Sequence, residues 1–275
     1  MRLFKKKYFI SFEELLTIFF FSILIFALSL VRPLFFLNYD RLEAIHNNIN
    51  MCGFDFLCSF KDSGIVDFMN LILIIVPLYT VLILNITDNN SKMVRLIRFH
   101  DRKKMWKNQT SIVIFSALII TILLIGGGYL YGGIILKNFN NTWNTDYGYP
   151  YLMYGNTSVW IRLSGKLYTG KVISVFFITT FMGLSFIGTL ICTLKLVLKN
   201  IYTFLIIVTI PVTDFYLVFH FTVFEQIIVT TTQWIYPNSI VKNNIYFLVG
   251  FLVFYTIGGY INLKMDQTIS KEIKA

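Results

Sequence analysis

Charged side chains are scarce in this chain of 275 residues. Only 14% of the residues are charged, whereas an ordinary soluble domain carries roughly 25%. Apolar side chains make up 56% of the sequence, and the 28 phenylalanines exceed what one globular core of this size needs. This balance excludes an ordinary soluble domain, because too much apolar surface would remain in water. The chain is therefore predicted to be an integral membrane protein.

Motifs of catalytic and metal sites are also missing. The sequence has no nucleotide-binding GxxxxGK[ST] loop, no GxSxG elbow and no HExxH pair. The three histidines, His46, His100 and His220, are far apart in the sequence. We therefore expect no catalytic residues, no metal site and no directly bound cofactor. The chain is predicted not to be an enzyme, so a partner must supply any energy that it uses.

The net charge of +10 raises the question of a nucleic-acid partner. The basic residues, however, lie in short segments beside long apolar runs. This placement is typical of loops at a membrane surface. We expect the lipid bilayer, and not nucleic acid, to be the partner of these charges.

Six apolar runs are long enough to cross the hydrocarbon core of a bilayer, which takes roughly 20 residues. They are continuously apolar, which favours helices over barrel strands in lipid. The first run is too long for a signal peptide and has no cleavage site, so we assign it as a span. The sequence predicts an all-α polytopic protein with a single transmembrane domain over residues 1–275. Its spans are approximately 17–37, 67–87, 111–136, 172–194, 201–223 and 244–263.

The distribution of lysine and arginine predicts the orientation. With the N-terminus inside, the inner segments hold 16 basic residues and the outer segments hold 7. This bias places the N-terminus in the cytoplasm, and six spans return the C-terminus to the same side.

A capping box begins just before the first span. In Ser11-Phe-Glu-Glu14 the serine hydroxyl can accept a hydrogen bond from the amide three residues on. One interpretation is a short N-terminal interfacial helix that then turns into the span. The other interpretation is that these residues form the irregular first turn of the span itself. We adopt the interfacial helix as the prediction.

Two cysteines lie six residues apart in the first outer loop, residues 38–66. On an oxidising face, Cys52 and Cys58 are predicted to form a disulfide that staples the loop, with free thiols as the alternative. The third cysteine, Cys192, lies inside a span.

The second outer loop, residues 137–171, is rich in aromatic residues with polar tips. Such rings favour the lipid–water boundary, which predicts an interfacial belt. The alternative is a lining that receives an amphipathic or peptide substrate. The residues are Trp143, Tyr147, Tyr149, Tyr151, Tyr154, Trp160 and Tyr168.

The fifth span contains ionisable residues. Asp214 and His220 lie within it and Glu225 lies just beyond. A charge at mid-membrane costs at least about 2.5 kcal/mol, so such groups face protein or water. These three form a candidate intramembrane polar site. Asp214 either hydrogen-bonds to a neighbouring helix or takes part in the substrate path.

The third span contains a GxxxG pair at Gly128 and Gly132. Small residues at this spacing let helices approach closely, which predicts tight packing. A flexible point in a moving helix is the alternative.

The inner loop between the second and third spans, residues 87–110, carries seven basic residues. Read as a helix from about Ser91, it places Arg95, Arg98 and Arg102 on one stripe. The loop either orients the chain and binds anionic headgroups, or docks into a cleft of a cytoplasmic partner.

The stretch Arg95-Leu-Ile-Arg98-Phe-His-Asp-Arg102-Lys-Lys-Met-Trp106-Lys107 resembles a basic segment found in small Firmicute permeases of bacteriocin-immunity and antimicrobial-peptide transporters. The interfacial helix, the six spans and the basic loop resemble type-2 ABC exporter permeases over the whole chain. The chain departs from that family in one respect, because the outer segment that joins its fifth and sixth spans, residues 224–243, is short. The resemblance implies a coupling helix within Lys92–Lys107. Its coupling residues would be Arg95, Arg98, Arg102, Lys103, Lys104 and Trp106.

This resemblance implies a permease domain in the bacterial cytoplasmic membrane. It would pair with itself or with a second permease and bind two cytoplasmic ATPase subunits, which hold ATP and Mg. The implied cargo is a peptide or an amphipathic antimicrobial. The alternative function is an energy-independent accessory protein, a sensor or immunity factor, that binds a peptide at its outer loops.

Overall fold

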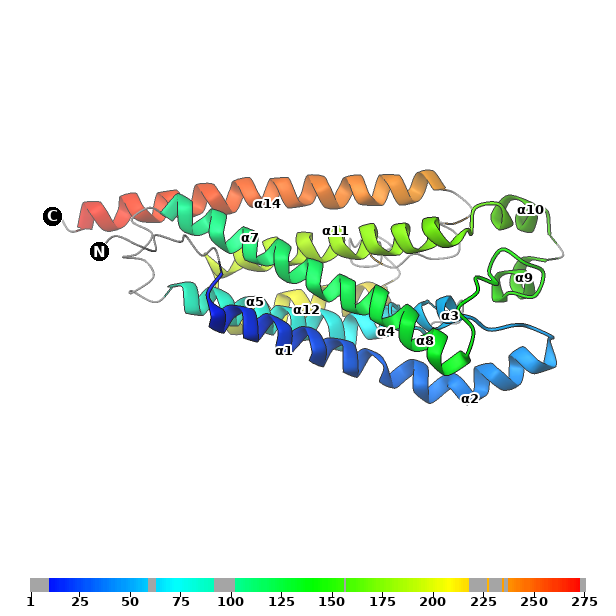
Figure 1. Cartoon of the computed structure of the whole chain (residues 1–275). Coiled ribbons are helices and arrows are strands. Elements are labelled where there is room, and N and C mark those ends of the chain that lie inside the picture. Colours follow the sequence, from blue (N-terminus) through cyan, green and yellow to red (C-terminus); the bar gives the residue numbers. More distant parts are fainter. Residues whose placement is uncertain are drawn as a thin grey trace, which may run out of the picture.

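The computed structural model describes residues 10–58, 63–91, 102–155, 157–217 and 237–272, together with residues 227 and 234. Within this part of the chain the regular structure is helical and contains no strand, which confirms the all-α prediction. The long helices run side by side along one axis (Figure 1). The elements in chain order are α1 (Phe12–Ser29), α2 (Val31–His46), α3 (Gly53–Leu57), α4 (Phe68–Asn70), η1 (Leu71–Ile75), α5 (Val76–Ser91), α7 (Arg102–Thr121), η2 (Ile122–Gly127), α8 (Gly128–Leu136), α9 (Tyr149–Tyr154), α10 (Ser158–Ser164), α11 (Thr169–Lys195), α12 (Asn200–Leu217) and α14 (Pro237–Glu272).

Among the described residues, five helical stretches are long and apolar enough to cross a membrane. A shorter apolar helix, Asn200–Thr213 within α12, lies where the fifth span is predicted, and residues 218–223 of that span lie outside the described part. The fifth span, and with it the total of six, therefore stays a prediction, as does the orientation. The five stretches are Phe12–His46, Phe68–Asn89, Arg102–Leu136, Thr169–Lys195 and Asn238–Lys264.

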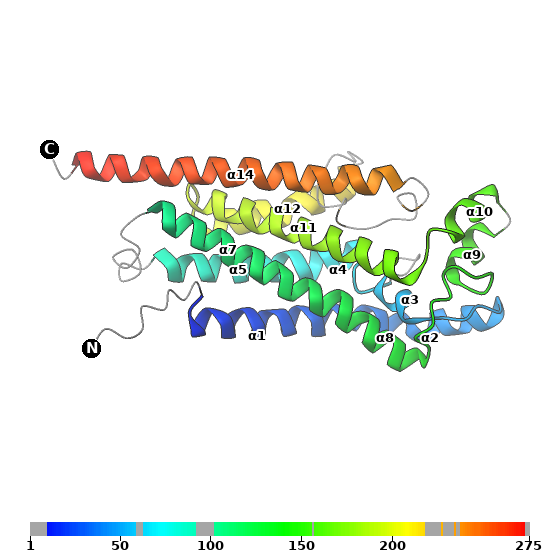
Figure 2. The same cartoon turned by 45° about the horizontal axis from the view of Figure 1, so that its top comes forward.

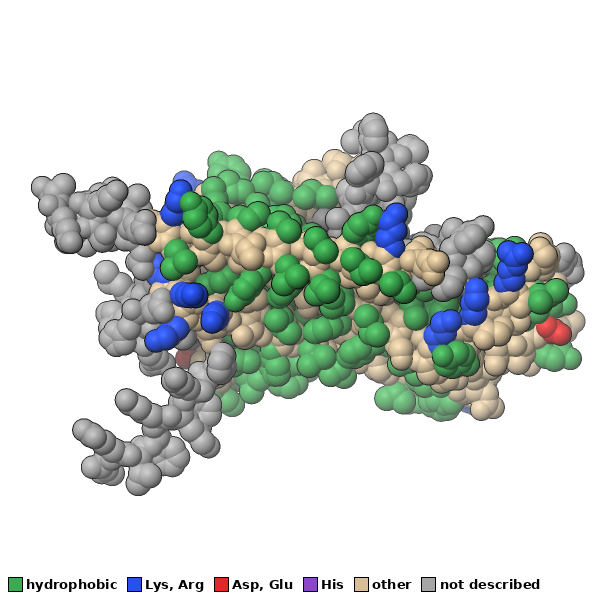
Figure 3. All heavy atoms as spheres, turned by 90° about the horizontal axis from the view of Figure 1, so that it is seen from above, with side chains coloured by type: hydrophobic (Ala, Val, Ile, Leu, Met, Phe, Trp, Pro, Cys, Tyr) green, Lys and Arg blue, Asp and Glu red, His purple; other side chains and the backbone are tan. Residues whose placement is uncertain are grey.

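The exterior of the bundle has the character of a surface in contact with lipid. Apolar side chains occupy the middle of the face in Figure 3, and lysines and arginines gather toward its two ends. On α14 large apolar residues such as Leu252, Val253 and Ile257 are exposed. In water this pattern would be unfavourable, whereas in lipid it is the expected one.

Several of the hydroxyl groups inside the bundle donate to carbonyl oxygens of their own helices. Ser22 donates to the carbonyl oxygen of Ile18 at 2.7 Å, and Thr80 donates to that of Val76 at 2.7 Å. This bonding to the preceding turn lets a span carry small polar residues without leaving a polar atom unpaired in lipid.

The junction between α1 and α2 follows from a proline. Pro33 has no amide hydrogen, so the carbonyl oxygen of Ser29, four residues earlier, lacks its helical donor. The side-chain amide of Asn70 donates to that oxygen at 3.0 Å and also to the carbonyl of Gly64 at 2.9 Å. One buried side chain thus ties the bend in the first stretch to the start of the second.

The capping box at the N-terminus is confirmed. The amide of Glu14 donates to the Ser11 hydroxyl at 3.3 Å, and the amide of Ser11 donates to the Glu14 carboxylate at 2.7 Å. The predicted interfacial helix after this box is wrong, because α1 runs unbroken from Phe12 to Ser29. Nothing between Leu15 and Thr17 breaks a helix, so the cap begins the span itself. Residues 1–9 lie outside the described part.

The two ends of the bundle differ. At one end α3, α9, α10 and the far half of α2 gather into a folded unit, which we call the cap (Figures 1 and 2). At the opposite end lie the end of α5, the start of α7 and the turn between α11 and α12. We call this the basic end; its described cations are Arg102, Lys103, Lys104, Lys107, Lys195, Lys199 and Lys264.

Candidate coupling site

The structure describes the residues on both sides of the predicted coupling loop, up to residue 91 and from residue 102. Arg95 and Arg98 fall within residues 92–101, which lie outside the described part. Arg102, Lys103, Lys104 and Trp106 are described and form the first turns of α7. This part of the predicted docking segment is therefore continuous with the third span, so a displacement of it moves the span directly.

The start of α7 is anchored to α14. The Trp106 side chain is buried, and its Nε1 donates to the carbonyl oxygen of Tyr255 at 3.0 Å. The ring lies against Gly258 and Gly259, where a side chain on Gly258 would overlap it. One turn earlier, the Asn262 side-chain amide donates to the carbonyl of Arg102 at 2.9 Å. We call these contacts the α7 anchor.

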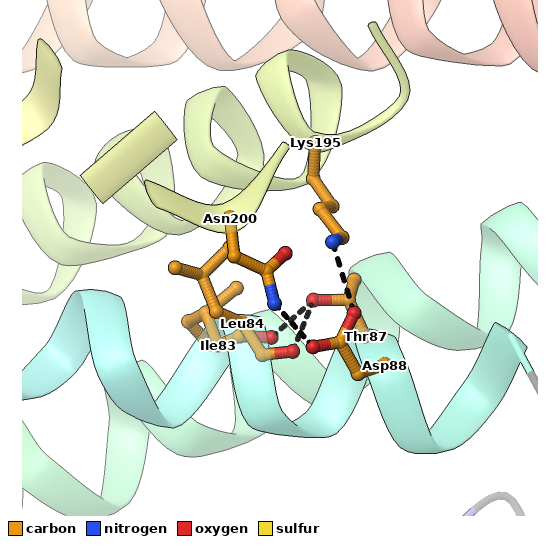
Figure 4. A network of polar contacts seen from close by, with 6 residues as sticks. All are labelled: Ile83, Leu84, Thr87, Asp88, Lys195 and Asn200. Carbon is orange, nitrogen blue, oxygen red and sulfur yellow. Dashed lines mark hydrogen bonds and ion pairs between the residues drawn. The ribbon is translucent and has the colours of Figure 1, made fainter. Parts of the chain in front are cut away.

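The end of α5 is anchored to the turn between α11 and α12 (Figure 4). Lys195 Nζ lies 3.0 Å from Asp88 Oδ1, and the Asn200 side-chain amide donates to Asp88 Oδ2. The neighbouring Thr87 hydroxyl donates to the carbonyl oxygens of Ile83 and Leu84 within α5. We call the contacts of Asp88 the α5 anchor.

The two anchors connect the flanks of one loop to different helices. The flank at α5 is held by the α11–α12 turn, and the flank at α7 is held by α14. The two ends that border this loop are thus attached to two different parts of the bundle. Within the described residues no group of three His, Cys, Asp or Glu side chains is placed to hold a metal ion.

The predicted intramembrane polar site lies largely outside the described residues. Asp214 belongs to α12, but its side chain is outside the described part, as are His220 and Glu225. That site stays a prediction.

The predicted disulfide is not present in the structure. Cys52 and Cys58 are free thiols at the two ends of α3, where they are the N-cap and C-cap residues. A helical segment of six steps separates Cα atoms by about 9 Å, which exceeds the roughly 7 Å that a disulfide can bridge. The helix between the two cysteines holds them apart in this structure, and the disulfide stays a prediction.

The core of the cap is a buried carboxylate. Trp143 Nε1 donates to Asp55 Oδ1 at 2.6 Å, and the amide of Cys52 donates to Asp55 Oδ2 at 2.7 Å. Burial raises the pKa of Asp55 to about 7, although both hydrogen bonds favour the charged form. Burial, with the charge of Asp55 beside it, raises the pKa of the Cys52 thiol to about 12. Cys52 is therefore a protonated, unreactive thiol at neutral pH.

Three of the loop aromatic residues belong to this core and form neither a belt nor a lining. Trp143, Tyr149 and Trp160 are buried. The Tyr149 hydroxyl donates to the carbonyl of Asp40 at 3.0 Å, and Trp160 Nε1 donates to Asp146 at 3.1 Å. For these three residues both sequence interpretations are wrong, because the two loops pack against each other. Among the others, Tyr147 and Tyr168 are exposed.

The glycines of the third span do favour close packing. The helix that packs against them is α3, which belongs to the first outer loop. A side chain on Gly128 would lie 2.6 Å from Leu57, and one on Gly53 would lie 2.8 Å from the carbonyl oxygen of Tyr129. Gly132 faces Phe56. The loop helix thus lies directly on the backbone of α8.

Comparison of the chain with protein-family models, with curated proteins and with solved structures finds no match. Any functional assignment therefore rests on the residues of the chain itself.

Proposed function

We propose that this chain is the membrane-spanning permease subunit of an ABC transporter in the bacterial cytoplasmic membrane. It would export a peptide or another amphipathic antimicrobial while a separate subunit binds ATP and Mg and hydrolyses the ATP. The observation that carries the proposal is the double anchoring of the basic loop. Force applied to residues 92–101 would reach α14 through Trp106 and the α11–α12 turn through Asp88.

The proposal places the basic end in the cytoplasm and counts α12 as the fifth of six spans. The excess of lysine and arginine at inner segments supports this orientation. A partner on the cytoplasmic side would then meet the loop between α5 and α7 directly.

The charges at the start of α7 support a partner that is acidic. Lys103 and Lys104 are exposed in the first turn of a helix, where the positive end of the helix dipole disfavours cations by roughly 0.3–1 kcal/mol each. Carboxylates of a partner subunit would offset this repulsion. Trp106, on the buried side of the same turns, would pass the resulting movement to α14.

The test is affinity purification of the full chain from its native cells in mild detergent. We expect a subunit with nucleotide-binding motifs to be recovered in proportion to the chain, and the purified complex to hydrolyse ATP. The double charge reversal Lys103→Glu, Lys104→Glu should lower this recovery about tenfold, which corresponds to about 1.4 kcal/mol. The control is Lys242→Glu, a single charge reversal at the far end of α14, which should leave recovery unchanged.

Two outcomes would overturn the proposal. One is recovery of the chain without any nucleotide-binding subunit, even after crosslinking in intact cells. The other is labelling of residues 102–107 by a membrane-impermeant reagent added to the outside of intact cells.

A second candidate function is favoured by the cap. Both loops form one folded unit, and its surface presents exposed Tyr147, Ile161 and Tyr168. An energy-independent sensor or immunity factor that binds a peptide there would need such a preformed surface. Purification without an ATPase, combined with peptide binding that is lost in Ile161→Asp, would favour this function over the permease.

A further inference from the structure

The cap turns several of its acidic side chains inward. Asp40 and Asp55 are buried, and Trp143 donates to Asp55 at 2.6 Å. Asp146 is exposed, but its carboxylate accepts a hydrogen bond from Trp160 Nε1 at 3.1 Å. These three carboxylates are therefore engaged inside the cap.

The basic side chains of α10 and of the start of α11 reach the surface instead. Arg162 is exposed, and Lys171 is half-buried. Within the described chain neither of these two residues forms an ion pair. Figure 3 looks onto this side of the molecule, where lysines and arginines gather at the cap together with apolar side chains. The surface, which we call the α10 face, consists of Ile161, Arg162, Lys166, Tyr168 and Lys171.

The start of α11 adds to the positive potential of this face. The helix has 27 residues, and its first turn contains no acidic residue but does contain Lys171. The N-terminal end of a helix carries roughly half a positive charge, which an aspartate or glutamate in the first turn would offset. In this helix that complement is missing, so the potential favours a negatively charged partner.

Apolar side chains lie between the cations of the α10 face. Ile161 is 80% exposed and Tyr168 is 57% exposed. The adjacent Leu163 and Leu167 are fully buried, so the backbone that carries these side chains is held in place by the core of the cap. A partner that covers the face therefore needs apolar groups as well as negative charges, and it would meet a preformed surface.

The arrangement of the cations favours a peptide over a lipid surface. α10 lies beyond the start of α11, farther from the spans (Figures 1 and 2). Arg162 on α10 and Lys171 on α11 therefore lie at different distances from the membrane. The headgroups of a bilayer form a layer at one height. An extended peptide, which advances about 3.3 Å per residue, can follow the cations from one height to the next.

We infer that the α10 face is a docking site for an acidic peptide that also carries apolar side chains. Carboxylates of the peptide would pair with Arg162, whose planar guanidinium suits such a group, and with Lys171. Its apolar residues would cover Ile161 and Tyr168. The inference rests on the peptide binding of the second candidate function and adds the charge of the ligand. A cationic peptide would be repelled by the same face.

The test uses the full-length protein in nanodiscs of zwitterionic lipid, with a fluorescent dye on Gly165→Cys. The native cysteines are buried, and a side chain at position 165 would point into open space, so the dye should label this position selectively. The probes are three peptides of equal length in which leucine alternates with glutamate, glutamine or lysine. We expect the glutamate peptide to bind about tenfold more tightly than the glutamine peptide, and the lysine peptide to bind least.

Two further probes check the chemistry of the contact. A peptide that alternates serine with glutamate lacks apolar side chains and should bind several-fold more weakly than the leucine–glutamate peptide. Binding of the latter should also weaken several-fold between about 0.1 M and about 1 M NaCl, because salt screens exposed charges.

Charge variants locate the contact on the α10 face. Arg162→Glu should lower the affinity for the leucine–glutamate peptide about tenfold, and Arg162→Gln should lower it less. Both variants change an exposed side chain that makes no ion pair within the described chain, so the protein should fold. The control is Lys199→Glu, which reverses an exposed charge at the opposite end of the bundle and should leave the affinity unchanged.

The inference is overturned if the glutamate peptide binds no more tightly than the lysine peptide, or if Arg162→Glu binds it like the wild type. A dye that responds to nanodiscs of anionic lipid but to none of the peptides would show that the face meets a membrane instead. Equal binding of the three leucine peptides would remove the charge preference and leave peptide binding at the cap intact. Absence of binding by all of them would remove the second candidate function as well. The proposed permease is tested separately, by recovery of an ATPase subunit.

Discussion

At the cap, the residues that join the two loops are buried and bonded to one another, whereas at the basic end the α5 anchor links helix ends through side chains that are partly exposed. Asp55 and Trp143 are shielded from water, but the side chains of Lys195 and Asp88 keep 23% and 43% of their surface exposed. The same contrast applies to what is joined, since the cap connects loops and the basic end connects spans.

This difference in burial indicates which end of the bundle can rearrange. A buried carboxylate with two donors is strongly destabilised when one donor is removed, so the cap has one favourable arrangement. A partly exposed ion pair contributes roughly 0–1 kcal/mol and re-forms easily. The cap is therefore expected to be the rigid end of the bundle. The α5 anchor at the basic end is expected to be the contact that rearranges when a partner acts on it.

The largest effect is expected from Trp143→Ala in the cap. The substitution leaves a cavity and removes a donor from the buried Asp55, so the free energy of unfolding should fall by about 3–5 kcal/mol. The measurement is thermal unfolding of the purified protein in detergent. Tyr147→Ala, an exposed aromatic in the same loop, should change the stability by less than about 0.5 kcal/mol. Equal losses in both variants would contradict the rigid cap.

The second effect is a pH dependence that belongs to the cap. Folding raises the pKa of Asp55 from 3.8 to about 7, so the folded protein holds a proton that the unfolded chain has released. The stabilisation from this group is fully present below about pH 4, is lost as the pH rises to about 7 and then stays level, with a total change on the order of 4 kcal/mol. In Asp55→Asn the unfolding temperature should lack this fall. A wild-type profile parallel to that of the variant would refute the assignment.

The helices of this protein could be predicted from the sequence because each span is a local apolar run. The cap could not be predicted in this way. Asp55 and Trp143 are 88 residues apart, and the sequence around either residue does not indicate that the other is its partner. Asn70 illustrates the same limit: Pro33 indicates that a carbonyl loses its donor, but not which side chain replaces it. At the candidate site the basic turns of α7 were predictable from charge. The partners of Trp106 on α14 were not, because they lie about 150 residues further along the chain.

At the basic end, Trp106→Phe sharpens the comparison. The ring still packs against α14, but the hydrogen bond to Tyr255 is lost, so stability should fall by only about 1 kcal/mol. Transport should suffer more than stability, because the α7 anchor would pass less movement to α14. The measurement pairs thermal unfolding with peptide export and with recovery of the ATPase, which should stay unchanged. A variant that exports normally would show that this contact does not carry the movement.

The smallest effect is expected from Lys195→Ala, which removes the ion pair of the α5 anchor. Asn200 still donates to Asp88, and the pair is partly exposed, so the loss in the free energy of unfolding should be about 0.2–1 kcal/mol. Salt screens such a pair, so the loss should shrink between 0.05 M and 1 M NaCl (about 14 Å to 3 Å in screening length). The loss in Trp143→Ala should not shrink, because its contacts are buried. If salt instead affected both variants alike, the distinction between a fixed cap and an adaptable basic end would lose its electrostatic basis.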